Sequence, residues 1–158
     1  MNKDNFYIIE AEVDENNLIT WNTELEQERK SALFDIINTG FFKLNKKKTG
    51  PYKIKLRLFE WKLFIKVFDL SDKSETNIKA SLSLVRRIIR DYQIVCENYI
   101  DAIKTAPLKK IEAIVVGRRS IHDEGALLLK ELLNNQVEID IEIARRIFTL
   151  ISIISSKI

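Results

Sequence analysis

Cysteine and histidine are scarce in this chain of 158 residues, and their scarcity excludes several kinds of site. Cys96 is the single cysteine, so an internal disulfide and a four-thiolate zinc site are both excluded. His122 is the single histidine and lies far from Cys96 in the sequence, which argues against a transition-metal site. We therefore predict no metal site, no cofactor and a reducing cytoplasm as the setting.

A large excess of one charge and long hydrophobic runs are absent as well. The net charge of +3 is well below that of a dedicated nucleic-acid binder. The most apolar stretch, residues 147–154, is interrupted by Thr149 and Ser152 and is too short to cross a bilayer, which takes ~20 residues. Residues 1–5 are polar where a signal peptide has its apolar core. We expect a soluble chain that folds as one domain over residues 1–158 and does not enter a membrane.

Alternating patterns predict a sheet in the N-terminal half. Residues 6–13 are predicted to form a strand with two distinct faces, and apolar residues alternate with cations over residues 53–58, as in a half-buried strand. Residues 63–68 are expected to form the strand that follows. Glu60 and Trp61 separate the last two runs and predict the turn of an antiparallel hairpin. Residues 77–82 are expected to add one further short strand. One helix belongs to this half, because a capping-box pattern at residues 23–26 precedes an apolar stripe that ends near Gly40.

Helical periodicity dominates the C-terminal half. Residues 85–103 carry a clean apolar stripe behind Ser83, a candidate cap. Pro107 is expected to open a helix that ends at Gly117, and a second capping box at Ser120 predicts a new helix up to residue 133. Asp140 is expected to cap a last helix that is apolar around much of its circumference, and is either central to the core or a dimer surface. The predicted class is α+β, an N-terminal antiparallel sheet with one helix followed by a mostly helical C-terminal half.

Several strings in the chain resemble one protein family. These are residues 86–92 (RRIIRDY), 117–125 (GRRSIHDEG) and 144–150 (ARRIFTL), with residues 26–29 and 50–52 in support. The chain resembles uncharacterised family 0262 of the alphaproteobacteria over nearly its whole length. The resemblance implies a bacterial, cytosolic protein and implies no activity.

Residues 117–125 are the segment in which a binding site is most expected. Two of the four glycines bracket it, and it contains the only histidine. A helix that starts at Ser120 would offer free amides and a positive dipole end to an anion, and Arg118 and Arg119 would add guanidinium groups suited to phosphate or carboxylate. The same dipole would lower the pKa of His122 and keep its ring neutral. The simpler interpretation is an ordinary capped helix start.

Other arginines are candidates for the same site. Arg86 and Arg90 lie off the apolar stripe of their helix, and Arg145 belongs to the last helix. One hypothesis is that they converge with Arg118 on a shared cleft, with Glu97 nearby. The favoured interpretation is a solvated surface on which charged pairs contribute ~0.3–0.5 kcal/mol each.

A lysine-rich surface and an aromatic turn suggest further partners. Trp61, in the predicted hairpin turn, is expected to be exposed and to mark a partner surface. Trp61 and Tyr52 could stack on nucleic-acid bases beside the basic residues, but a solvated edge that discourages strand pairing is the favoured interpretation. The basic residues are Lys43, Lys46, Lys47, Lys48, Lys53, Lys55 and Arg57.

Three functional hypotheses follow, in order of preference. The first is a small binding or regulatory module that recognises an anionic small molecule or an acidic protein through Arg86, Arg90, Arg118, Arg119 and Arg145. The second is an enzyme in which His122 acts as base, with Glu124 or Glu97 nearby, on a substrate that carries phosphate or carboxylate. The third is weak binding of nucleic acid by the lysine-rich strands. A homo-oligomer is compatible with each of them if the last helix forms a dimer surface.

Overall fold

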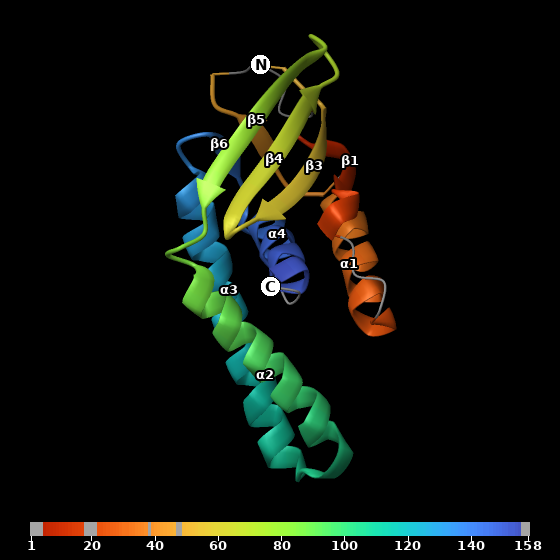
Figure 1. Cartoon of the computed structure of the whole chain (residues 1–158), viewed down its shortest axis with the longest axis vertical. Helices are drawn as coiled ribbons and strands as arrows, with labels where there is room; N and C mark the ends of the chain where they lie inside the picture. The colour runs from red at the N-terminus through yellow and green to blue at the C-terminus, as the bar shows by residue number, and fades with distance from the viewer. Residues whose placement is uncertain (1–4, 18–21, 38, 47–48, 156–158) are drawn as a thin grey trace.

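The strands of the N-terminal half form one twisted sheet in the computed structural model, which describes residues 5–17, 22–37, 39–46 and 49–155 (Figure 1). The spatial order is β1-β3-β4-β5, in which β3, β4 and β5 are antiparallel neighbours and β1 lies parallel to β3. The sheet strands are β1 (Ile8–Val13), β3 (Tyr52–Phe59), β4 (Lys62–Asp69) and β5 (Ser74–Ser81). The predicted α+β class, with a helical C-terminal half, is confirmed.

Smaller elements complete the N-terminal half. A 3-10 turn, η2 (Glu15–Asn17), follows β1, and β2 (Phe42–Leu44) pairs in antiparallel fashion with β6 (Val137–Ile139). This two-stranded pairing joins the two halves of the chain. Lys47 and Lys48 of the predicted basic surface lie outside the described residues.

Helix α4 (Ile141–Ile154) lies behind the sheet and forms the centre of the core (Figure 1). Asp140 caps it as predicted: its Oδ1 accepts from the Ile143 amide at 3.0 Å, and its Oδ2 accepts from the Phe41 amide at 3.0 Å. Every residue from Ile147 to Ile154 is buried. The two predictions for this helix are a central place in the core and a dimer surface, and the place in the core is confirmed. None of the described helices is both long and apolar enough to cross a membrane.

Helix α1 (Thr23–Ile36) packs against α4 and stands apart from the other helices (Figure 1). The predicted cap is shifted by one residue, because Asn22 and not Thr23 accepts the Leu25 amide, at 3.0 Å. Only Ala32 and Ile36 are buried along α1. The inward side of α1, near the N-terminus of this helix, therefore borders a cleft.

Helices α2 (Arg86–Thr105) and α3 (Leu108–Leu133) form a hairpin that projects away from the sheet (Figure 1). The predicted helix boundary between Gly117 and Ser120 is wrong, since α3 continues through both residues without a break. The backbone amides around Arg118 and Arg119 are therefore interior to a helix and cannot form the predicted anion site at a helix N-terminus.

Two glycines of α3 have opposite surroundings. A Cβ built on Gly117 would have no neighbour within 4 Å apart from the backbone of its own helix. Gly117 therefore neither ends the helix nor packs against another element. A Cβ built on Gly125 would lie 2.2 Å from Cε2 of Phe148, on α4. Gly125 is thus required because the ring of Phe148 occupies the space that a side chain would take.

Trp61 does occupy the β3–β4 turn, where Glu60 and Trp61 both have positive φ, but the prediction of an exposed aromatic is wrong. Its exposed fraction is 9%. The guanidinium groups of Arg86 and Arg90, from the first turns of α2, stack on its ring at 4.8 and 4.9 Å from the centroid. The chain returns from β5 into α2 directly over the turn, so the two arginines cover it.

The continuity of α3 makes a testable prediction for its two glycines. The G125A variant should lower the free energy of unfolding by about 1–3 kcal/mol, because its methyl group would overlap the Phe148 ring. The matched G117A variant should raise it by up to about 1 kcal/mol, because alanine restricts the unfolded chain and favours helix. Urea unfolding of both variants measures the difference. Destabilisation by G117A would contradict a continuous helix.

Candidate functional site

A cleft of about 770 Å³ separates α1 from the α2–α3 hairpin, and α4 contributes to its lining. Clefts of this size accommodate small molecules. This cleft lies between the projecting α2–α3 hairpin and α1, which stands apart from that hairpin (Figure 1). The polar residues of its lining are Asn22, Glu24, Glu28, Ser31, Asp35, Tyr92, Gln93, Cys96, Glu97, Tyr99, Arg118, His122, Arg146, Thr149 and Ser152.

Arg118 extends from α3 into this cleft. Its guanidinium carbon lies 4.4 Å from the ring centroid of Tyr99, so the planar group stacks on the tyrosine of α2. Within the described part of the chain no acceptor forms a hydrogen bond or ion pair with it. A guanidinium that is oriented by stacking and keeps its donors free is suited to bind carboxylate or phosphate.

Carboxylates outnumber cations in the lining of the cleft. Burial raises the pKa of Glu28, and the positive charge of Arg118 opposes part of that increase. Arg146, on α4, pairs with Asp35 of α1 over 3.8 Å between Nε and Oδ2. Glu97 adds a further acid from α2. The cleft therefore offers a free cation beside carboxylates that can accept hydrogen bonds.

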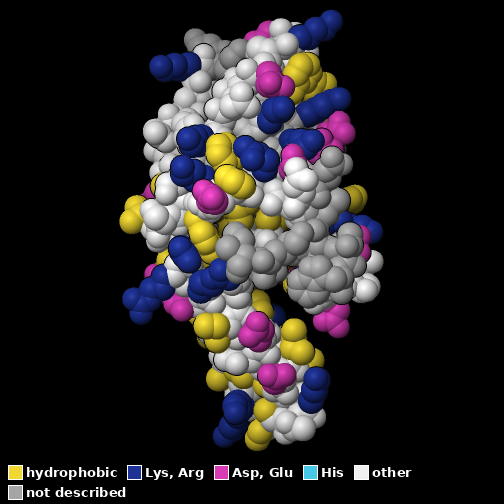
Figure 2. Space-filling model, in the orientation of Figure 1, with side chains coloured by type: hydrophobic (Ala, Val, Ile, Leu, Met, Phe, Trp, Pro, Cys, Tyr) yellow, Lys and Arg dark blue, Asp and Glu magenta, His cyan; other side chains and the backbone are white. Residues whose placement is uncertain are grey.

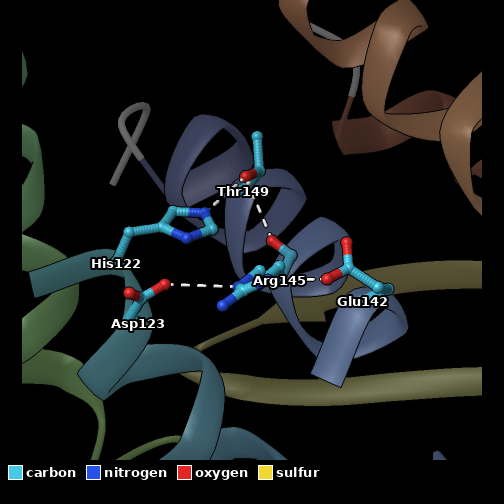
Figure 3. A network of polar contacts seen from close by, with 5 residues as sticks. All are labelled: His122, Asp123, Glu142, Arg145 and Thr149. Atoms are coloured by element: carbon cyan, nitrogen blue, oxygen red, sulfur yellow. Dashed lines mark hydrogen bonds and ion pairs between the residues drawn. The ribbon is translucent and has the colours of Figure 1, made fainter. Parts of the chain in front are cut away.

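His122 lies one helical turn beyond Arg118, on the same side of α3. Its Nε2 is 2.8 Å from the hydroxyl of Thr149, and that hydroxyl donates to the carbonyl of Arg145 at 3.1 Å (Figure 3). Both contacts are satisfied only when Nε2 carries the hydrogen and the threonine oxygen accepts it. In that tautomer Nδ1 is left with the lone pair that can accept a proton.

Aromatic rings enclose the imidazole. The centroids of Tyr92 and Phe148 each lie 5.2 Å from that of His122, and the two aromatic rings contact one another at 5.4 Å. This apolar enclosure lowers the pKa of His122; the negative charge of Asp123 opposes part of that decrease, and the positive charges of Arg145, Arg146 and Arg118 add to it. The predicted direction is confirmed, but burial and not a helix dipole is the main cause.

Tyr92 and Cys96 form a second polar pair on the cleft wall. Both side chains line the cleft one helical turn apart on α2, and burial is the main cause that raises the pKa of both groups. A buried thiol with a raised pKa stays protonated near neutral pH and is a poor nucleophile. This pair is therefore suited to hydrogen bonding and not to covalent chemistry.

The structure brings together only part of the predicted site. Arg145 does not line the cleft: it donates to Asp123 at 3.2 Å and to Glu142 at 2.6 Å (Figure 3). Arg119 is exposed and absent from the cleft lining, and it lines a smaller hollow of about 170 Å³ that shares Tyr92, Arg118 and His122 with the cleft. Glu124 is exposed and absent from the cleft lining, whereas Glu97 is present. With Arg86 and Arg90 stacked on Trp61, the predicted residues in the cleft are Arg118, His122 and Glu97.

Sequence reasoning missed Glu28, Tyr99 and Arg146. A signal existed for Glu28, because it lies three residues after Leu25 and four before Ala32, on the inward side of α1. A carboxylate at an inward position of a helix is unusual without a functional or structural partner. No comparable signal identified Arg146, since its neighbour Arg145 looks the same in sequence. In the described ranges no three His, Cys, Asp or Glu side chains are grouped as a metal site requires.

Comparison with known proteins finds one family. A family model described as "Uncharacterised protein family (UPF0262)" matches residues 5–157. A UPF0262 protein of Cereibacter sphaeroides is 38% identical over 155 residues, which cover 93% of this chain and 96% of that protein. A UPF0262 protein of Jannaschia is 40% identical over 151 residues, with 94% and 96% covered, and one of Rhodospirillum rubrum is 37% identical over 155, with 98% and 96% covered. No solved structure matches.

The lowered pKa of His122 predicts how stability depends on pH. The ordinary value of 6.5 applies to the unfolded chain, which therefore takes up a proton at higher pH than the folded protein does. The free energy of unfolding should thus fall as the pH drops below about 6.5, until the folded-state pKa is passed. In H122Q, which keeps a donor for Thr149 but does not titrate, this contribution should vanish.

Urea unfolding of both proteins between pH 7.5 and 5.5 isolates the contribution, because titration of Glu28 and the other acids is common to both. The stability of the wild-type protein relative to H122Q should decrease as the pH is lowered. An increase instead would mean that His122 gains a favourable charge partner on folding.

Proposed function

The chain belongs to the uncharacterised protein family UPF0262, and within that family we propose that it is a small binding module that takes up an anionic small molecule through Arg118. The ligand occupies the cleft between α1 and the α2–α3 hairpin. The observation that carries the proposal is that Arg118 is oriented by Tyr99, faces the cleft and has no acceptor within the described residues. A guanidinium that is already oriented by stacking can bind an anion with little loss of side-chain freedom.

The charges beside Arg118 narrow the chemistry of the ligand. Glu28, Asp35 and Glu97 would repel a ligand that carried negative charge alone. A molecule whose carboxylate or phosphate meets Arg118, and whose amine or hydroxyl groups donate to Glu28 or Glu97, satisfies both sets of groups. A zwitterionic or hydroxylated acid therefore fits better than a polyanion. The cleft volume favours such a molecule over the acidic protein partner that the sequence also allowed.

An enzymatic role is the second candidate, and the tautomer of His122 favours it. With Nε2 held by Thr149, the Nδ1 lone pair of a neutral ring is available as a proton acceptor. The lowered pKa keeps the ring neutral at physiological pH. Because Glu124 is exposed and lies outside the cleft, Glu28 or Glu97 would take its place as the second proton-transfer group.

A cytoplasmic setting and self-association form part of the proposal. The bacterial relatives and the single cysteine agree with a reducing compartment. Since α4 is buried within the chain, association would use other surfaces. Exposed apolar side chains along the outside of the α2–α3 hairpin, including Ile94, Ile103 and Val116, support this choice.

The proposal predicts which arginine matters for ligand capture. A panel of amino acids, hydroxy acids, dicarboxylates and phosphate esters at millimolar concentration should contain at least one compound that raises the melting temperature of the wild-type protein. In R118Q that shift should disappear, and the affinity for the compound should fall at least about tenfold, because a charged hydrogen bond to the ligand is lost. Thermal shift followed by calorimetry measures both effects.

R119Q is the matched control, since it removes the same charge from the neighbouring residue outside the cleft. It should leave both the melting shift and the affinity unchanged. Equal losses of affinity in R118Q and R119Q would show that binding depends only on the net charge of the protein and not on Arg118. A panel without any stabilising compound would overturn the proposal.

A further inference from the structure

The outer face of the sheet is a second surface with a distinct chemistry. Along β3 and β4 the residues Ile54, Leu56 and Leu63 point into the core, so their neighbours in sequence point outwards. Figure 2 shows Lys and Arg side chains gathered on this face, where Figure 1 draws β3 to β5, with hydrophobic side chains among them. The outward cations are Lys53, Lys55, Arg57, Lys62, Lys66 and Lys79.

Two of these cations lie in an unfavourable arrangement. Lys55 and Lys66 are direct cross-strand partners on the same face. Like charges in opposed positions destabilise an antiparallel pair. Glu12 is the neighbour of Lys55 on β1, but within the described ranges no carboxylate comes within ion-pair distance of either lysine. An external polyanion would remove this repulsion.

Aromatic rings lie among the cations. Phe64 and Phe68 are half-buried on the outer face of β4. The guanidinium of Arg57 stacks on Phe64 at 4.3 Å from the ring centroid, and Nζ of Lys79 lies 5.8 Å from the same centroid. A ring and a guanidinium plane stacked together on a strand are the kind of platform on which unpaired bases stack.

We propose that the outer face of β3, β4 and β5 binds single-stranded nucleic acid. Phosphates lie along the lysines, above all between Lys55 and Lys66, and a base stacks on the Arg57–Phe64 platform. The eight-residue strands span about 25 Å, enough for several nucleotides. This surface is separate from the cleft, and its function does not depend on a ligand there.

The residues that the sequence suggested for stacking are not those that the structure offers. Tyr52 is fully buried and the exposed fraction of Trp61 is 9%, so neither ring is accessible to a base, whereas Phe64 and the guanidinium of Arg57 stacked on it are partly exposed. The face also carries Glu10, Glu12 and Glu75, and Lys53 pairs with Glu10 at 3.3 Å, but the six cations outnumber these three acids. The net charge of +3 concealed this excess, because four acids and two arginines line the cleft. A single-stranded partner fits better than a duplex, since stacking on Phe64 requires an unpaired base.

The test is fluorescence anisotropy with labelled 20-nucleotide oligo(U) RNA, oligo(dT) DNA and a mixed-sequence DNA duplex, titrated with the full chain from 50 to 200 mM KCl. The oligo(U) RNA and the oligo(dT) DNA should each bind more tightly than the duplex. Whichever single strand has the higher affinity identifies RNA or DNA as the preferred partner. In K55Q/K66Q the affinity should fall about tenfold, and the slope of log affinity against log salt should decrease by about 1.4.

Two further variants separate the platform from simple charge. F64L keeps an apolar side chain but removes the ring, and should weaken single-strand binding at least about fivefold. K109Q/K110Q removes the same charge from the exposed start of α3, and should leave binding within about twofold. Equal losses in K55Q/K66Q and K109Q/K110Q would overturn the proposal. So would duplex binding as tight as single-strand binding, unchanged binding by F64L, or capture by phosphatidylglycerol vesicles in place of the oligonucleotides.

Discussion

The contact between Gly125 and the ring of Phe148 determines how α3 lies on α4, and the geometry of the cleft depends on it. Because Gly125 has no side chain, the aromatic ring can approach the backbone of α3 more closely than any other residue would allow. The same ring contacts Tyr92 of α2 and His122 of α3. One buried phenylalanine therefore sets the positions of the residues that line the cleft wall, and the His122–Thr149 hydrogen bond is a consequence.

A second set of contacts joins the sheet to the helices. Arg90 stacks on Trp61 and donates to the side-chain carbonyl of Gln93 at 2.9 Å. Gln93 in turn donates to the carbonyl of Ser152, in the last turn of α4, at 2.7 Å. The β3–β4 turn, α2 and α4 are thus linked through polar side chains. Arg86 and Arg90 therefore stabilise the contact between the sheet and the helices and do not line the cleft.

The sheet and the order of elements could be predicted because alternation reports burial directly. Ile54 and Leu56, each between two charged neighbours, indicated that one side of β3 faces the core, and Asp140 before an apolar run indicated the start of α4. The pairing of β1 beside β3 could not be predicted, since register depends on contacts distant in sequence. The three-residue strands β2 and β6 are too short to show a period, although residues 137–139 were expected to be extended.

The site was harder to predict than the fold. Ser120 and Gly117 have the composition of a helix boundary, but capping residues also occur inside helices when tertiary packing on both sides outweighs propensity. Arg118, Arg145 and Arg146 are alike in sequence, and only packing shows that Arg118 has no acceptor among the described residues while Arg145 has two acids. Charge likewise had to be mapped in space, because a nearly balanced total conceals an acidic cleft and a basic sheet face.

The central claim is that anionic small molecules bind between α1 and the α2–α3 hairpin. A ¹H–¹⁵N NMR titration with a stabilising compound tests it most directly, because every backbone amide reports its own position. The account expects the largest shift changes at Glu28, Tyr92, Arg118 and Thr149, four residues on four different helices that share only the cleft. Changes confined to other surfaces, with these four amides unmoved, would contradict it.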